Sequence, residues 1–80
     1  MRLPRDLTGR DLAAALARFG YQISRQTGSH IRLTTTIHGE HHVTIPDDSP
    51  LRIGTLAGVL ADVAAHFGLS KDTLVERLFE

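Results

Sequence analysis

Two side chains suited to acid–base chemistry and anion binding stand close together in the stretch Thr27-Gly28-Ser29-His30-Ile31-Arg32. An imidazole can take and return protons at neutral pH, because its unperturbed pKa is about 6.5. A guanidinium is permanently charged and binds oxyanions through a planar set of donors. His30 and Arg32 are two residues apart, so on an extended strand both side chains point to the same face. The stretch therefore predicts a place where proton transfer and anion binding meet.

The residues around this stretch alternate between apolar and polar with a period of two, which is typical of half-buried strands. We expect three strands, within residues 21–26, 30–37 and 42–45, joined by two-residue turns at Gly28-Ser29 and His38-Gly39. The residues expected to share one face are Tyr21, Ile23 and Arg25 in the first strand and Ile31, Leu33, Thr35 and Ile37 in the second. Because that face of the second strand is apolar, His30 and Arg32 should point to solvent.

Apolar residues spaced three and four apart predict helices on both sides of the strands. The first helix follows a capping residue, Thr8, with Asp11 in its first turn, and ends at Gly20. Its apolar residues are Leu12, Leu16 and Phe19. The second helix stops at Gly68, and Ser70 caps a short third one. Their apolar residues are Ile53, Leu56, Leu60, Val63 and Phe67 in the second helix and Leu74, Val75, Leu78 and Phe79 in the third.

This order predicts an α+β fold of one domain over residues 1–80. It consists of a helix, three antiparallel strands, a helix and a short C-terminal helix. The helices should cover one face of the three-stranded sheet, since their apolar sides need a surface to cover. The other face should then be polar and exposed to water.

The distribution of charge along the chain is uneven although the net charge is zero. Residues 1–37 contain six arginines and two aspartates, a net charge of +4. Residues 38–80 contain three basic and seven acidic residues, a net charge of −4. Such asymmetry is typical both of a nucleic-acid surface on one side and of an ordinary mixed-charge surface, and both interpretations stay open.

Composition excludes several other classes of protein. The chain has no cysteine, which rules out disulfides and thiolate metal sites. No apolar run approaches the ~18 residues of a membrane span, and the N-terminal residues lack the apolar core of a secretory signal. We therefore expect a soluble cytoplasmic protein that is not bound to a membrane.

The histidine-rich segment around Glu40 raises the question of a metal site. It contains His38, His41 and His42. Adjacent strand residues point to opposite faces, so His41 and His42 cannot easily bind one ion. His38 is expected in the turn. We predict no bound metal here and no cofactor elsewhere.

Four short motifs lie in a fixed order through nearly the whole chain. They are Phe19-Gly20-Tyr21, the run from Arg25 to His30, Val43-Thr44-Ile45-Pro46 and Ile53-Gly54-Thr55-Leu56. In this order and spacing the chain resembles the HicA-like toxins, which are small messenger-RNA interferases of bacterial toxin–antitoxin pairs.

The resemblance implies a fold like that of double-stranded-RNA-binding domains and a metal-independent endoribonuclease activity on mRNA. It implies that His30 is the catalytic residue and that Gly28 and Ser29 belong to the motif that places it. We expect RNA contacts from these two residues and from Arg25 and Arg32. The implied protein partner is a HicB-like antitoxin.

Two alternatives keep the same fold without the enzymatic activity. The chain is then a non-catalytic module that binds RNA or a partner protein, or a small interaction protein without RNA. The zero net charge favours these alternatives, because phosphate contacts dominate RNA affinity. The order and spacing of the four motifs favour the nuclease.

Overall fold

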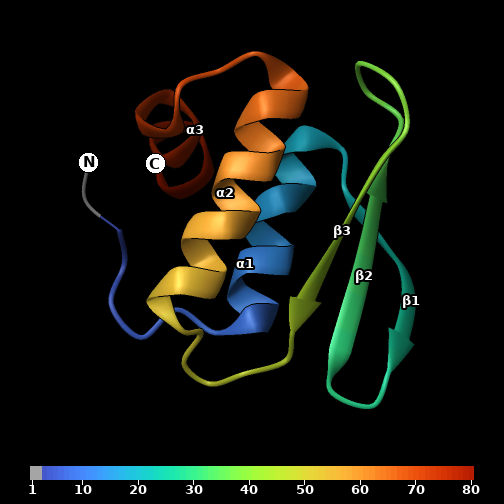
Figure 1. Cartoon of the computed structure of the whole chain (residues 1–80), viewed down its shortest axis with the longest axis vertical. Helices are drawn as coiled ribbons and strands as arrows, with labels where there is room; N and C mark the ends of the chain where they lie inside the picture. Colours follow the sequence, from blue (N-terminus) through green and yellow to red (C-terminus); the bar gives the residue numbers. More distant parts are fainter. Residues whose placement is uncertain (1–2) are drawn as a thin grey trace.

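The computed structural model describes residues 3–80 as a three-stranded antiparallel sheet with helices on one of its faces (Figure 1). The elements in chain order are α1 (Gly9–Leu16), a 3₁₀ turn η1 (Ala17–Phe19), β1 (Gln22–Thr27), β2 (His30–Thr35), β3 (His41–Pro46), α2 (Ile53–Phe67) and α3 (Lys71–Phe79). Helices α1 and α2 lie against the sheet, and α3 lies on the side of these helices away from it. The arrangement confirms the predicted fold class.

The first helix begins as its sequence predicts and ends earlier. The Thr8 hydroxyl accepts a hydrogen bond from the Asp11 amide at 3.0 Å, and the Asp11 carboxylate accepts one from the Thr8 amide at 3.1 Å. This reciprocal pair satisfies two backbone donors that the helix itself leaves open. The α-helix stops at Leu16, and a tighter 3₁₀ turn carries the chain to Gly20, whose φ of 82° ends it. The predicted single helix is therefore two short elements.

The second and third helices confirm their predicted ends but not every predicted core residue. Gly68 takes a left-handed conformation at the end of α2, and the Ser70 hydroxyl accepts from the Thr73 amide at the start of α3. Ile53 was predicted on the buried side of α2, and this was wrong: it is 79% exposed. It is the first residue of the helix, and the core begins one turn later, at Leu56.

The sheet packs its inner face, the face under α1 and α2, through alternate residues of β2 and β3. Ile31 pairs with Ile45 and Leu33 with Val43 across the two strands, and all four are buried. Burial of such aliphatic side chains stabilises the fold by ~1.5–3 kcal/mol each. Polar residues occupy the alternate positions. The inner face is therefore apolar and the opposite face polar, as predicted.

Strand β1 departs from the predicted alternation because it contains a β-bulge. The pairing with β2 shifts by one residue between Ile23 and Arg25, so that Ser24 is an extra residue beside Arg32. All six residues of β1 are exposed, including Ile23 at 52%. The bulge places Arg25 opposite Arg32, on the polar face. The prediction that Arg25 shares a face with Tyr21 and Ile23 was therefore wrong.

Strand β2 also ends sooner than predicted, at Thr35. The Thr35 hydroxyl donates to the carbonyl of Phe19 at 2.9 Å and accepts from the amide of Ile37 at 3.2 Å. The bond from the Ile37 amide occupies a donor that pairing between strands would otherwise use. Ile37 is 47% exposed and is not part of the covered face. The connection to β3 spans residues 36–40, which is longer than the two-residue turn predicted at His38-Gly39.

In the part of the chain from residue 3 onward, no single helix is long and apolar enough to cross a membrane. Helices α2 and α3 meet that requirement only when taken together, and they are bent by 101° at the break between them.

Candidate active site on the outer face of the sheet

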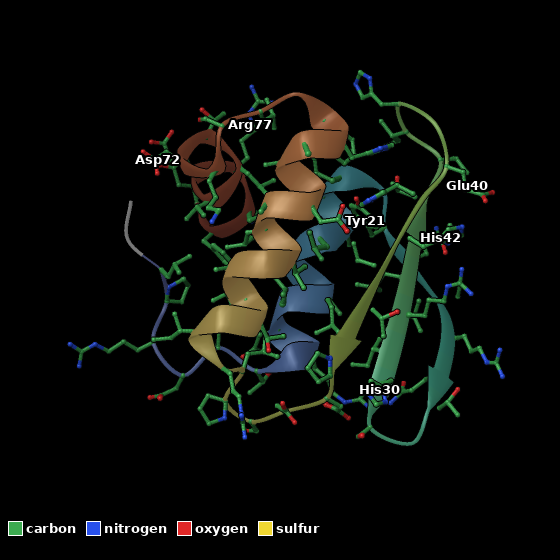
Figure 2. All side chains as sticks on the ribbon, in the orientation of Figure 1. Tyr21, His30, Glu40, His42, Asp72 and Arg77 are labelled. Carbon is green, nitrogen blue, oxygen red and sulfur yellow. The ribbon has the colours of Figure 1, made fainter. Side chains whose placement is uncertain are left out.

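The outer face of the sheet is the face turned away from α1 and α2. It holds three of the predicted site residues, His30 (labelled in Figure 2), Arg25 and Arg32. The register of the three strands brings ten side chains to it. They are Gln22, Ser24, Arg25 and Thr27 from β1, His30, Arg32 and Thr34 from β2, and His42, Thr44 and Pro46 from β3. This face is open, as expected for a short chain that cannot enclose a deep cleft.

A tight hairpin places His30 at the start of β2. Thr27 pairs with His30 across the two-residue turn Gly28-Ser29, which confirms the predicted connection. Gly28 has a φ of +54°, and a Cβ there would meet nothing within 4 Å, so the glycine serves backbone conformation rather than space. The carbonyl of Ser29 accepts a hydrogen bond from the amide of Asp47 at 2.6 Å. This bond fastens the turn to the loop after β3.

The His30 side chain is exposed, and both of its ring nitrogens are available. Its ring makes no hydrogen bond and no ion pair with any residue from 3 to 80. Its neighbours across the sheet are Thr27 on β1 and Pro46 on β3. A ring with no partner can reach a proton on a ligand that lies on the face.

Arg25 and Arg32 lie opposite each other on β1 and β2, next to the His30 end of the face. Neither guanidinium forms an ion pair within residues 3–80. Like charges directly opposite each other across two strands are unfavourable. An anion between them would remove that repulsion, so the pair is suited to bind a phosphate group.

The acidic loop next to His30 is partly neutralised. Asp47 follows Pro46, the residue that pairs with His30, and its carboxylate lies 3.3 Å from the guanidinium of Arg10. Such an exposed ion pair adds only a little stability, on the order of 0–1 kcal/mol. Its effect on the site is to reduce the negative charge next to His30.

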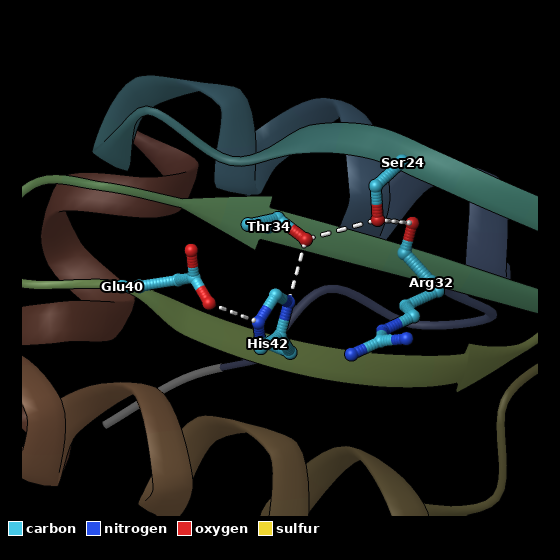
Figure 3. A network of polar contacts seen from close by, with 5 residues as sticks. All are labelled: Ser24, Arg32, Thr34, Glu40 and His42. Carbon is cyan, nitrogen blue, oxygen red and sulfur yellow. Dashed lines mark hydrogen bonds and ion pairs between the residues drawn. The ribbon is translucent and has the colours of Figure 1, made fainter.

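A second polar network on the outer face was not predicted (Figure 3). His42 lies between the Glu40 carboxylate, 3.0 Å from its Nε2, and the Thr34 hydroxyl, 2.7 Å from its Nδ1. The Thr34 hydroxyl continues to that of Ser24 at 2.9 Å, and Ser24 donates to the carbonyl of Arg32 at 3.3 Å. Only Glu40 and His42 are close in sequence. The other contacts depend on strand register and on the bulge, for which the sequence has no local signal.

A third network lies on the inner face, where His41 contacts Tyr21 and Asp62. The Tyr21 hydroxyl lies 2.7 Å from His41 Nδ1, and Asp62 Oδ1 lies 3.1 Å from Nε2. The ring of His66 stacks on that of His41, with centroids 4.4 Å apart, and its Nε2 donates to the carbonyl of Ile37. Burial, and secondly the charge of Asp62, raise the pKa of Tyr21 to about 12. This network gives a buried hydroxyl its partner and joins β3 to α2.

The three histidines of the second hairpin lie apart, on the two faces of the sheet and in the loop before β3. His41 and His42 point to opposite faces, and His38 lies in the loop with a φ of 59°. Within residues 3–80, no group of three or more histidine, aspartate or glutamate side chains is arranged to hold an ion.

Comparison with known proteins gives one match. The family model for the HicA toxin of bacterial toxin-antitoxin pairs matches residues 9–64, which is 56 of the 80 residues. No curated protein and no solved structure matches the chain. The matched range runs from the first residue of α1 into α2, and it includes the His30 hairpin and the whole sheet. The chain therefore belongs to the HicA toxin family of toxin–antitoxin systems.

Proposed function

We propose that this toxin is an endoribonuclease that cleaves mRNA on the outer face of its sheet, with His30 as its acid–base residue. One observation carries the proposal: on an open face of a HicA-family chain, the His30 ring has no partner among residues 3–80 and lies beside two arginines that form no ion pair with those residues. Membership of the family supports the toxin class. The arrangement of His30, Arg25 and Arg32 is the reason for proposing RNA cleavage.

The reaction requires one proton to leave a ribose 2′-hydroxyl. The imidazole of His30 accepts this proton, the 2′-oxygen forms a bond to the adjacent phosphorus, and the bond from phosphorus to the 5′-oxygen breaks. The departing oxygen takes a proton from water, which reaches this open face freely. The products are a 2′,3′-cyclic phosphate and a free 5′-hydroxyl. In the alternative assignment His30 is the general acid that protonates the leaving oxygen.

Arg25 and Arg32 supply positive charge to the phosphate. As the 2′-oxygen attacks, negative charge grows on the non-bridging oxygens, and a fixed cation beside them lowers the barrier. Gly28 and Ser29 contribute through the turn that sets the position of His30, and their backbone lies beside the bound strand. This mechanism has no step that requires a metal ion, so we expect cleavage to persist in the presence of a chelator.

We also propose a HicB-like antitoxin as the protein partner, and the outer face as the surface it covers. Membership of a toxin–antitoxin family implies an antitoxin. A protein that blocks His30 and pairs with Arg25 and Arg32 would stop both RNA binding and chemistry. Co-expression with the product of the adjacent gene should give a stable complex by size exclusion, and Arg25→Glu with Arg32→Glu should weaken it.

The test of the nuclease proposal compares His30→Ala with His38→Ala, an exposed histidine in the loop between β2 and β3. Loss of a positioned acid or base costs ~10²–10⁴-fold in rate. His30→Ala should therefore lose RNA cleavage and growth inhibition at unchanged melting temperature, because its side chain lies outside the core. His38→Ala should retain activity. Equal cleavage by His30→Ala and wild type would refute the assignment.

The second candidate is a non-catalytic module that binds RNA or a partner through the same face. The observation in its favour is the net charge of zero, which limits the number of phosphate contacts. RNA binding by the wild type with no cleavage over long incubation would favour this module over the nuclease.

A further inference from the structure

A hollow of about 280 Å³ opens at the end of the sheet away from the His30 hairpin. The residues that line it are Gly20, Gln22, Ile23, Ser24, Thr34 and Thr36. Two of these, Ser24 and Thr34, belong to the network in Figure 3. None of the lining residues is charged, so the hollow differs in kind from the arginine-rich end of the same face.

The hydroxyl protons of Ser24 and Thr34 are already used within the protein. In one arrangement Thr34 donates to Ser24, and Ser24 donates to the carbonyl of Arg32. If His42 instead carries no proton on Nδ1, Thr34 donates to that nitrogen at 2.7 Å. In both cases the two hydroxyl oxygens offer only lone pairs to a ligand. A ligand in the hollow must therefore bring its own N–H donors.

The hollow lies at a defined spacing from His30 along β2. Thr34 is four residues from His30 on the same face, which corresponds to about 13 Å at ~3.3 Å per residue. An extended RNA strand that runs along β2 from His30 reaches the hollow within a few nucleotides. A strand with its reacting phosphate at His30 would thus present a nearby base to the hollow.

We propose that the hollow binds an amino-bearing nucleobase of the RNA, a few nucleotides from the cleaved bond, and so sets sequence preference. This inference rests on the proposed nuclease function. Adenine, cytosine and guanine carry an exocyclic amino group whose two protons can donate to both the Ser24 and Thr34 oxygens, whereas uracil offers a single N3–H and can satisfy only one of them. The amide of Gln22 and the hydroxyl of Thr36 make no side-chain hydrogen bonds with residues 3–80, so they can complete the contact with the base edge.

The other features of the hollow fit a base better than a phosphate or a charged peptide. No arginine or lysine lines it, so an anion would find no cation there. Ile23 at its wall is 52% exposed, and the flat face of a base can cover the exposed part of such a side chain. The two arginines thus lie near His30, whereas the residues that line the hollow are neutral hydrogen-bonding or apolar groups.

The first experiment maps cleavage sites on a mixed-sequence RNA for wild type, Gln22→Ala and Thr34→Val. Loss of one hydrogen bond changes binding by about fivefold, at ~1 kcal/mol each. In both variants the discrimination against uridine at one position near the cleaved bond should fall about fivefold. Cleavage itself should still require His30. Thr44→Val is the matched control, since it removes a hydroxyl from the same face outside the hollow. An unchanged base preference in both variants would overturn the proposal.

The second experiment separates this inference from the nuclease proposal. It uses the His30→Ala protein, which binds without cutting, and pentanucleotides that carry adenosine or uridine at the tested position. Fluorescence anisotropy should show about fivefold tighter binding of the adenosine form, and Gln22→Ala should remove the difference. Equal binding of both forms overturns the base site even if cleavage requires His30. A preserved preference without any cleavage by wild type supports the base site and removes only the nuclease. Variants that weaken antitoxin binding without changing base preference would assign the hollow to the protein partner instead.

Discussion

His30 on the outer face and His41 on the inner face show how differently one sheet can hold two histidines. The ring of His41 lies between a buried hydroxyl and a carboxylate, at 2.7 and 3.1 Å, and a second ring covers it. The ring of His30 has no partner among residues 3–80. A histidine with both nitrogens engaged stabilises the fold, whereas one with both free remains available for a ligand. The number of partners, rather than the residue type, separates the two roles.

The same contrast divides neighbouring residues of β2. Leu33 is 1% exposed and packs between the helices and β3, whereas Arg32 extends into solvent on the other side. Two adjacent residues of β2 thus differ in role: Leu33 stabilises the core, and Arg32 presents a positive charge to solvent.

The largest effect on stability is expected from Leu33→Ala on the inner face. Removing most of a buried aliphatic side chain costs ~2–5 kcal/mol, because a cavity remains where the side chain was. Arg32→Ala on the outer face should stay within ~0.5 kcal/mol of wild type. Urea denaturation of both variants measures the difference. Similar losses in the two variants would mean that the faces do not divide the roles as the structure shows.

The second effect is a loss of stability at alkaline pH that originates from Tyr21. Its phenol ionises near pH 10 in an unfolded chain, but in the folded protein burial, with the charge of Asp62, raises its pKa to about 12. Between these values the unfolded state loses a proton that the folded state keeps. Stability from this group is therefore fully present below pH 10 and falls as pH rises to 12, by roughly 2 kcal/mol.

Tyr21→Phe isolates this contribution, since it removes the ionisable group and keeps the ring. At neutral pH the variant should be ~0.5–1.5 kcal/mol less stable, because the bond to His41 is lost. Between pH 10 and 12 its stability should fall less steeply than that of the wild type. Denaturation curves at pH 8, 10 and 11.5 give the comparison. Parallel profiles would show that Tyr21 does not titrate with the raised pKa.

The inner face was predictable from sequence because burial leaves a simple pattern. The period of two in residues 31–35 identified β2 and its buried side, and it placed His30 and Arg32 on the other side. The caps at Thr8 and Ser70 were equally local, since each depends on a residue three positions along the chain. Features of this kind need no knowledge of distant contacts.

The outer face was only partly predictable, because its arrangement depends on pairing between strands. The bulge at Ser24 moves Arg25 to the face of Arg32, and a simple alternation cannot contain that extra residue. The link from His42 to Thr34 likewise requires the register of β2 with β3. Ile37 and Ile53 were misassigned for a related reason: an apolar residue fits a periodic pattern even where no other element covers it. Ile23 lies on the predicted face, opposite Leu33, but is 52% exposed.

The smallest effect is also the sharpest test of the bulge, and it concerns Arg25. If Arg25 lies on the outer face opposite Arg32, each arginine neutralises one RNA phosphate, and each substitution by alanine should reduce the salt slope of RNA binding by ~0.7. If instead Arg25 followed the simple alternation, only Arg32→Ala would change the slope. Anisotropy titrations at several salt concentrations, in the His30→Ala background to prevent cleavage, measure the slopes. Arg18→Ala, on the 3₁₀ turn and away from this face, is the control and should leave the slope unchanged. A slope reduced by Arg32→Ala alone would place Arg25 outside the RNA surface despite the bulge.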